Sequence, residues 1–365
     1  MLLTIITGYF KSRYDVMLPI FELLHKGLTE IGTQHRFICF DFDDSKDGFL
    51  PNVPISTKEN TSLAQLINES ERVLTIDSYP IMEALSKIDK FPRDKIIIWV
   101  HYFKGHSRLF SQYRQERKVL TGHARFSDSA ISMLPPKLYD LGVKNYLKTL
   151  KKGTVIAQSI WTCLLVNRVY NVNCQGIVPV PIDEEEYSSI RNCQKDSQYL
   201  IFLGNYDDTK LTETVELVKW VKTEFSSLRA HSFGSRELSS RLSELSDVEI
   251  QYHGKVPKKD LIELYAKSLF TISPIYNGNF EMVPIESILS GTPVVTYYQP
   301  FMEITGNFHG VANLNNISEA KRLIEETLHS VRMDDMGIMQ QRISSEMNYL
   351  KVAGKLADLL ESTRL

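Results

Sequence analysis

Residues 277–286, NGNFEMVPIE, could bind an anionic ligand through the backbone and a sugar through a carboxylate. NGNF is a turn-rich stretch, and Pro284 suits the first turn of a helix, so we expect a helix to open near Met282. Free N–H groups and the positive end of the helix dipole favour a phosphate there. Glu286 lies near the start of this helix, where its carboxylate could accept hydrogen bonds from ribose hydroxyls. These groups predict a nucleotide-sugar site whose backbone donors come from Phe280, Glu281, Met282 and Val283.

Two strand–loop–helix units position this stretch. Residues 248–254 alternate like a strand, and 256–268 have a proline near a helix start and apolar residues at helical spacing. Residues 269–275, LFTISPI, are typical of a buried strand. The helix opening near Met282 should stop at Gly291, after which TPVVTY forms the next strand.

The same stretch resembles the donor-site signature of GT-B glycosyltransferases, especially of the retaining family 4 type (glycosyl transferases group 1). The matching positions are Glu286, Ser290, Gly291, Pro293, Val294 and Val295. The first glutamate of the family's E-x7-E pair is replaced by Gly278, and Glu281 is the nearest carboxylate. The resemblance implies two Rossmann-like doubly wound α/β domains that face each other across a cleft. It also implies sugar transfer from a nucleoside diphosphate donor such as a UDP-sugar, with retention and with no bound metal or other cofactor.

A second part of the signature concerns cations for the diphosphate. The family places G-R-x4-K-G after the first strand of the second domain, and Gly204 and Lys210 match it. Asn205 replaces the arginine, and Leu211 replaces the second glycine. The resemblance puts Asn205 and Lys210 at the donor site, with Lys210 as a catalytic residue that stabilises the leaving diphosphate. The alternative is an ordinary lysine on a surface loop.

His101 is a second candidate catalytic residue. It ends the buried strand KIIIWVH (95–101), and ligands of open α/β sheets bind outside the carboxyl ends of the strands. The resemblance implies that His101 contacts the donor sugar. A hydrogen-bonded structural histidine at a strand end is the alternative, and the sequence does not separate the two.

Strands and helices alternate from the N-terminus, which predicts parallel sheets. The loop after the first strand has only one glycine, so the dinucleotide fingerprint of hydride-transfer enzymes is absent. Residues 153–187 resemble the family's closing unit of the first domain, with matches at Ser159, Trp161 and Asp183. We therefore expect an acceptor-side domain over 1–187 and a nucleotide-sugar domain over 188–340. The resemblance implies that a helix over 341–365 packs back on the first domain.

Charge is unevenly distributed, although the net charge is only −2. Residues 104–152 hold eleven Lys or Arg against three acidic residues. They form either solvated helix faces or an acceptor patch for an anionic lipid, a glycan or nucleic acid. The acidic stretch 41–47, DFDDSKD, indicates a solvated loop rather than a metal site.

The chain's composition suits a folded protein without a membrane span. Of its 365 residues 43% are hydrophobic, and no apolar run approaches the roughly 20 residues that cross a bilayer. The N-terminal residues are typical of a strand rather than a signal peptide. The four cysteines form no CxxC pair, so we expect buried free thiols. Free thiols favour a cytoplasmic location, and a peripheral position at a membrane is the alternative.

Two rival functions stay open. One is another GT-B activity, such as an inverting glucosyltransferase or a nucleotide-sugar epimerase. The other is a non-catalytic nucleotide-sugar-binding protein, which the departures at Asn205 and Gly278 favour. Assays of sugar transfer or donor hydrolysis separate an enzyme from a binder.

Overall fold

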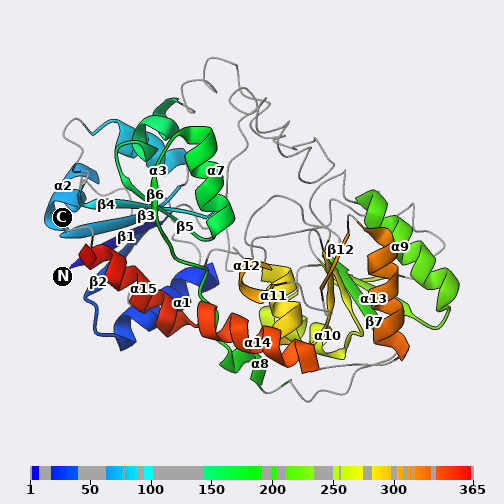
Figure 1. The fold of residues 1–365 in the computed structure, drawn as a ribbon. Helices are drawn as coiled ribbons and strands as arrows, with labels where there is room; N and C mark the ends of the chain where they lie inside the picture. The colour runs from blue at the N-terminus through cyan, green and yellow to red at the C-terminus, as the bar shows by residue number, and fades with distance from the viewer. Residues whose placement is uncertain are drawn as a thin grey trace. The chain divides into compact units, whose positions relative to one another are not determined.

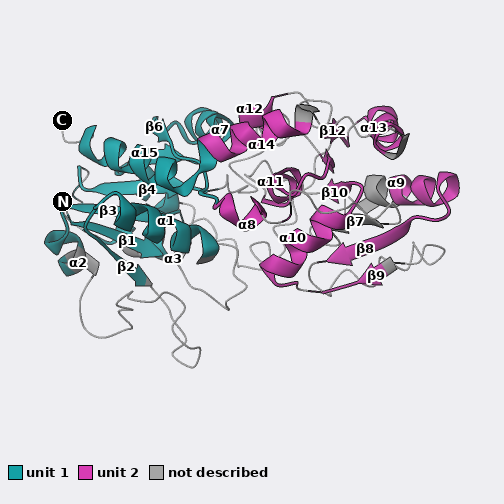
Figure 2. Cartoon of the chain, turned by 90° about the horizontal axis from the view of Figure 1, so that it is seen from below, with its two compact units in different colours: residues 1–110, 128–182, 346–365 teal, residues 111–127, 183–345 magenta. Residues whose placement is uncertain are grey.

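The computed structural model describes most of both halves of the chain. The described residues are 2–7, 18–39, 63–77, 79–88, 92, 94–101, 144–188, 190, 199–203, 211–233, 250–254, 256–273, 282–296, 302–306, 311–314, 316–329 and 334–362. The chain divides into two units (Figure 2). Unit 1 comprises residues 1–110, 128–182 and 346–365, and unit 2 comprises 111–127 and 183–345.

Unit 1 is built on a six-stranded parallel sheet with the order β2-β1-β3-β4-β5-β6. The strands are β1 (Leu3–Thr7), β2 (His35–Cys39), β3 (Arg72–Ile76), β4 (Ile96–Val100), β5 (Thr154–Ala157) and β6 (Cys174–Ile177). Every side chain of β1 and of β4 is buried. Such strands need cover on both faces, which explains the unbroken apolar sequence of β4 and the absence of charged residues from β1.

Helices cover both faces of this sheet (Figure 1). They are α1 (Leu18–Glu30), α2 (Leu63–Glu69), α3 (Tyr79–Ser86), α7 (Ile160–Tyr170) and α15 (Tyr349–Ser362). The last helix, α15, packs against α1, which lies near the start of the chain. The Tyr349 hydroxyl donates to a Glu30 carboxylate oxygen at 3.1 Å, and the Lys26 ammonium lies 4.3 Å from the centre of the Tyr349 ring.

Two backbone hydrogen bonds join separate segments of unit 1. The Ile182 N–H donates to the Met347 carbonyl at 2.8 Å, and the Tyr349 N–H donates to the Ile182 carbonyl at 3.0 Å. These bonds tie the end of the first segment to the C-terminal segment within unit 1. In this division the first part of unit 1 ends at residue 182, and its C-terminal segment begins at 346, inside helix α14 (Asp334–Met347).

Unit 2 has its own six-stranded parallel sheet, ordered β12-β11-β10-β7-β8-β9. Its strands are β7 (Tyr199–Leu203), β8 (Arg229–Phe233), β9 (Ile250–Tyr252), β10 (Thr271–Ser273), β11 (Val294–Thr296) and β12 (Val311–Asn313). Its other helices are α8 (Glu185–Ser188), α9 (Leu211–Glu224), α10 (Lys258–Lys267), α11 (Met282–Leu289), α12 (Met302–Thr305) and α13 (Ile317–His329). The α/β class with parallel sheets, predicted from the sequence, is confirmed.

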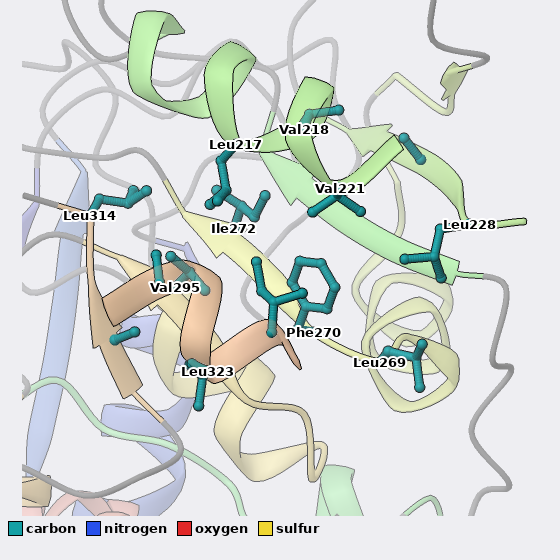
Figure 3. Close-up of a cluster of buried hydrophobic side chains, with 14 residues drawn as sticks. Leu217, Val218, Val221, Leu228, Leu269, Phe270, Ile272, Val295, Leu314 and Leu323 are labelled. Carbon is teal, nitrogen blue, oxygen red and sulfur yellow. The ribbon is translucent and has the colours of Figure 1, made fainter. Parts of the chain in front are cut away.

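The two faces of this second sheet have different roles. Helices α9 and α13 contact each other on one face, and α10 and α11 contact each other on the other (Figure 1). The α9–α13 face carries a hydrophobic core in which Leu217 and Val221 of α9 gather with Phe270, Ile272 and Leu323 (Figure 3). This core is apolar, whereas the α10–α11 face holds the buried acid described below.

The cysteine expectation is wrong for one pair. Cys163 and Cys174 form a disulfide with their Cα atoms 5.5 Å apart. Helix α7 ends at Asn171, whose φ of 53° is left-handed and turns the chain back, so that β6 begins beside the first turns of α7. Short cysteine spacings carry no signal of this reversal, so the sequence did not reveal the pair. A cytoplasmic location no longer follows from free thiols.

None of the described helices is long and apolar enough to cross a membrane.

The α1–α15 packing predicts opposite outcomes for two glycines. A Cβ on Gly27 of α1 would lie 2.6 Å from the Tyr349 carbonyl oxygen, whereas one on Gly354 of α15 meets nothing within 4 Å. Gly27→Ala should lower the free energy of unfolding by about 1–3 kcal/mol through overpacking. Gly354→Ala should raise it by up to about 1 kcal/mol through helix propensity. Denaturant unfolding of both variants checks this, and equal shifts would contradict the packing.

Candidate functional site

Helix α11 of unit 2 forms the centre of the candidate site. It begins at Met282, as the sequence predicts, and Gly291 follows its end with a φ of 74°. Met282 and Val283 are half-buried in its first turn, and all residues from Pro284 to Ser290 are buried. Four of the predicted site residues, Asn205, Lys210, Phe280 and Glu281, lie outside the described residues.

Hydroxyl groups fix the setting of α11 against the sheet. The Ser287 hydroxyl donates to the Thr292 carbonyl at 2.9 Å and shares a hydrogen bond with the Thr271 hydroxyl, 2.8 Å away. The Thr292 hydroxyl in turn donates to the Tyr265 carbonyl of α10 at 2.5 Å. These bonds connect α11 to β10 and α10, so the direction in which Glu286 points is set by tertiary structure.

Glu286 is a buried acid, only 9% exposed. Charged and phenolic groups from two helices surround it: Glu186 and Tyr187 come from α8, and Lys258 and Tyr265 come from α10. The Lys258 ammonium lies 2.5 Å from a Glu186 carboxylate oxygen. Both tyrosine rings are fully buried, and neither hydroxyl forms a hydrogen bond with a described residue.

Burial dominates the electrostatics of this cluster. It raises the pKa of Glu286 from 4.5 to about 7, against a lowering by Lys258 and with a further rise from Glu186. Burial, followed by the charge of Glu286, also raises the pKa of Tyr187 and of Tyr265 well above 10.0. Near neutral pH the Glu286 carboxyl can therefore accept hydrogen bonds as an anion or donate one as an acid.

His101 occupies the carboxyl end of β4 in unit 1, as predicted, and is buried. Its backbone N–H donates to Asp77 Oδ1 at 3.3 Å, and the Tyr146 hydroxyl donates to Asp77 Oδ2 at 3.0 Å. The His101 ring packs on Trp99 with 4.1 Å between the ring centres. The carboxylate between β3 and β4 thus holds the backbone at His101.

Asp77 and Tyr146 were missed by the sequence analysis. Asp77 directly follows the apolar strand β3, and a charged residue at that point was a usable signal. Tyr146 gave no such signal, because it lies on an ordinary helical segment 69 residues away.

Two residues matched through the family's closing unit have structural contacts. The Ser159 hydroxyl accepts a hydrogen bond from the Thr162 N–H at 3.0 Å and caps α7. Asp183 accepts one from the Glu185 N–H at 3.1 Å at the start of α8. Both are helix-capping bonds.

Comparison with known proteins finds a family match within the second unit. Residues 197–326 match the family described as Glycosyl transferases group 1. No curated protein sequence matches the chain.

Solved structures match over nearly the whole chain. WaaG, a glycosyltransferase involved in lipopolysaccharide biosynthesis, is 13% identical with a TM-score of 0.64, over 99% of this chain and 99% of its own. Sucrose-phosphate synthase from Thermosynechococcus elongatus is 13% identical with a TM-score of 0.70, over 99% and 98%. The Anabaena protein HepE, in complex with UDP and glucose, is 12% identical with a TM-score of 0.65, over 98% and 99%.

These likenesses define the fold of the chain as GT-B, the architecture that the sequence resemblance implied. Within that fold, residues 197–326 match the glycosyl transferases group 1 family, and the predicted resemblance is confirmed.

The raised pKa of Glu286 predicts a pH-dependent stability. Because the folded protein binds this proton more tightly than the unfolded chain, Glu286 contributes full stability below its unfolded pKa of about 4.5. The contribution is lost as the pH rises to about 7. The free energy of unfolding of Glu286→Gln should therefore rise by on the order of 3 kcal/mol relative to that of wild type as the pH increases from about 4.5 to about 7. Above that pH the difference should stay constant.

Urea unfolding at several pH values from 4.5 to 8.5 measures this difference. The matched control is Glu325→Gln on the exposed face of α13, for which we expect the same difference from wild type at every pH. A constant difference for Glu286→Gln would contradict the buried-acid assignment.

Proposed function

We propose that this protein transfers a sugar from a nucleoside diphosphate sugar to an acceptor hydroxyl, with retention of the anomeric configuration. The observation that carries the proposal is the group 1 family match over 197–326, which contains α11 and Glu286. The buried acid in the place of the family's ribose-binding glutamate supports it. Two structural neighbours support a UDP-sugar donor: HepE is in complex with UDP and glucose, and an E. coli trehalose-6-phosphate protein is bound with UDP-2-fluoro glucose.

Each candidate residue has a place in this proposal. The backbone of Phe280, Glu281, Met282 and Val283, together with Asn205 and Lys210, would hold the diphosphate. Glu286 would accept hydrogen bonds from the ribose, and His101 would contact the sugar. The residues 104–152 would face an anionic acceptor, a lipid, a glycan or nucleic acid, because of their excess of positive charge.

The chemical step follows from the leaving group. The bond between the anomeric carbon and the diphosphate oxygen breaks, and the acceptor oxygen forms the new bond on the same face of the sugar. The acceptor proton passes to the departing phosphate oxygen. The Lys210 ammonium would stabilise the negative charge that develops there. We include no metal or other cofactor in the proposal.

A non-catalytic nucleotide-sugar-binding protein is the second candidate. Asn205 and Gly278, in place of the family's arginine and glutamate, favour it, since a planar arginine clamp on the diphosphate is not reproduced by lysine alone.

A cation at the leaving diphosphate should affect turnover more than binding. We expect Lys210→Ala to reduce turnover about 10²-fold or more, with a much smaller loss of donor affinity. The donor is first found by a thermal-shift screen of UDP-, GDP- and dTDP-sugars, and its transfer or hydrolysis is then followed. Lys219→Ala, an exposed lysine on α9, is the matched control and should keep wild-type turnover.

The screen also decides between the two candidates. Wild-type protein that binds a donor but neither transfers nor hydrolyses it would contradict the enzyme and support the non-catalytic binder.

A further inference from the structure

We propose that Lys258 and Glu186, whose ion pair joins α8 to α10 beside the buried Glu286, are positioning residues that set the charge of the Glu286 carboxyl group when nucleotide binds. The inference rests on the proposed function, because it deepens the role of Glu286 at the nucleotide site. It assigns a joint role to helices α8 and α10, neither of which holds any of the site residues predicted from the sequence.

The ion pair joins α8 to α10. Asp183 caps the first turn of α8 through the Glu185 N–H, which fixes the short helix that carries Glu186 and Tyr187. From α10, Lys258 lies 2.5 Å from Glu186 and 5.9 Å from the centre of the Tyr187 ring. The ammonium of Lys258 therefore lies close to both Glu186 and the Tyr187 ring of α8.

Tyr265 extends the same face of α10. It lies two helical turns after Lys258, so both side chains project from one side of the helix. The Tyr265 ring packs edge-on against Phe233 with the ring centres 5.8 Å apart, and Val283 of α11 packs against this pair. Helix α10 thus presents a cation and a phenol to the side of α11 that carries Glu286.

The polar groups around Glu286 are not saturated among the described residues. The hydroxyls of Tyr187 and Tyr265 are buried and form no hydrogen bond with any described residue. Buried hydroxyls normally have a partner. Two such donors facing one buried carboxyl are an arrangement suited to a polar ligand rather than to a purely structural core.

The ion pair acts on Glu286 from two directions. The groups that face Glu286 among the described residues are Glu186 and Tyr187 of α8 and Lys258 and Tyr265 of α10, and Asp183 also faces Tyr187. Lys258 lowers the pKa of Glu286 and Glu186 raises it. The two partners of one ion pair therefore have opposite effects on the charge of Glu286, although removal of either breaks the same contact.

The charge matters because a ribose diol donates two hydrogen bonds to a carboxylate, and protonation takes away one of the acceptor positions. Nucleotide should therefore bind more tightly as the pH rises through about 7, and its binding should release a proton.

The test measures the Kd of UDP by calorimetry from pH 5.5 to 8.5 on the full chain. Lys258→Gln should move the midpoint of the pH dependence upward, and Glu186→Gln should move it downward, each by about half a pH unit or more. Lys258→Arg retains the cation and should restore the wild-type midpoint. Lys259→Gln, an exposed neighbour on α10, is the matched control and should leave it unmoved.

Equal weakening by Lys258→Gln and Glu186→Gln at every pH, with an unmoved midpoint, would overturn the inference and reduce the ion pair to a structural contact. The pH dependence of unfolding in the same variants keeps the two proposals distinguishable. If wild type binds none of UDP, GDP and dTDP but the stability midpoints move in opposite directions, the positioning role stands and the proposed nucleotide site fails. If UDP binds and neither midpoint moves, the nucleotide site stands and the positioning role fails.

Discussion

The burial of the Glu286 carboxyl is the constraint on which the second unit depends. An acid removed from water is costly unless it is neutralised or paired, and here it shifts toward the neutral form. Helix α11 cannot turn this side chain to solvent, because Ser287 bonds the helix to Thr271 and Thr292. The surrounding helices α8 and α10 place a cation and two phenols in the environment of the acid.

The buried acid of unit 1 has a different environment. Asp77 is buried too, but it accepts hydrogen bonds from the His101 N–H and from the Tyr146 hydroxyl. This hydrogen-bonded carboxylate holds the backbone at the end of β4 in place. It also connects β3 and β4 to the helical segment that carries Tyr146. The contrast separates a structural acid from a candidate ligand-binding acid: the phenols that face Glu286 have no described partner, whereas Tyr146 has one.

The sequence predicts local features of the site well. Pro284 and Gly291 mark the start and end of α11, and the apolar run 96–100 and the largely apolar segment 269–273 mark buried strands. These signals lie within a few residues of the structure they specify. The environment of Glu286 could not be predicted in this way. The contact between Lys258 and Glu186 depends on tertiary structure, because Asp183 bonds the start of α8 and α10 packs on α11. The disulfide was missed for the same reason, since it depends on the reversal at Asn171 rather than on a spacing.

The central claim is that Glu286 binds the ribose of a nucleotide, and a cycle that changes both partners tests it most directly. The Kd values of UDP and of 2′,3′-dideoxy-UDP are measured at pH 8 for wild type and for Glu286→Ala. A charge-assisted hydrogen bond contributes about 1.5–3 kcal/mol, so wild type should prefer UDP by roughly 10- to 100-fold. Glu286→Ala should lose most of that preference. An equal preference for UDP in both proteins would contradict the claim and leave Glu286 as a buried structural acid.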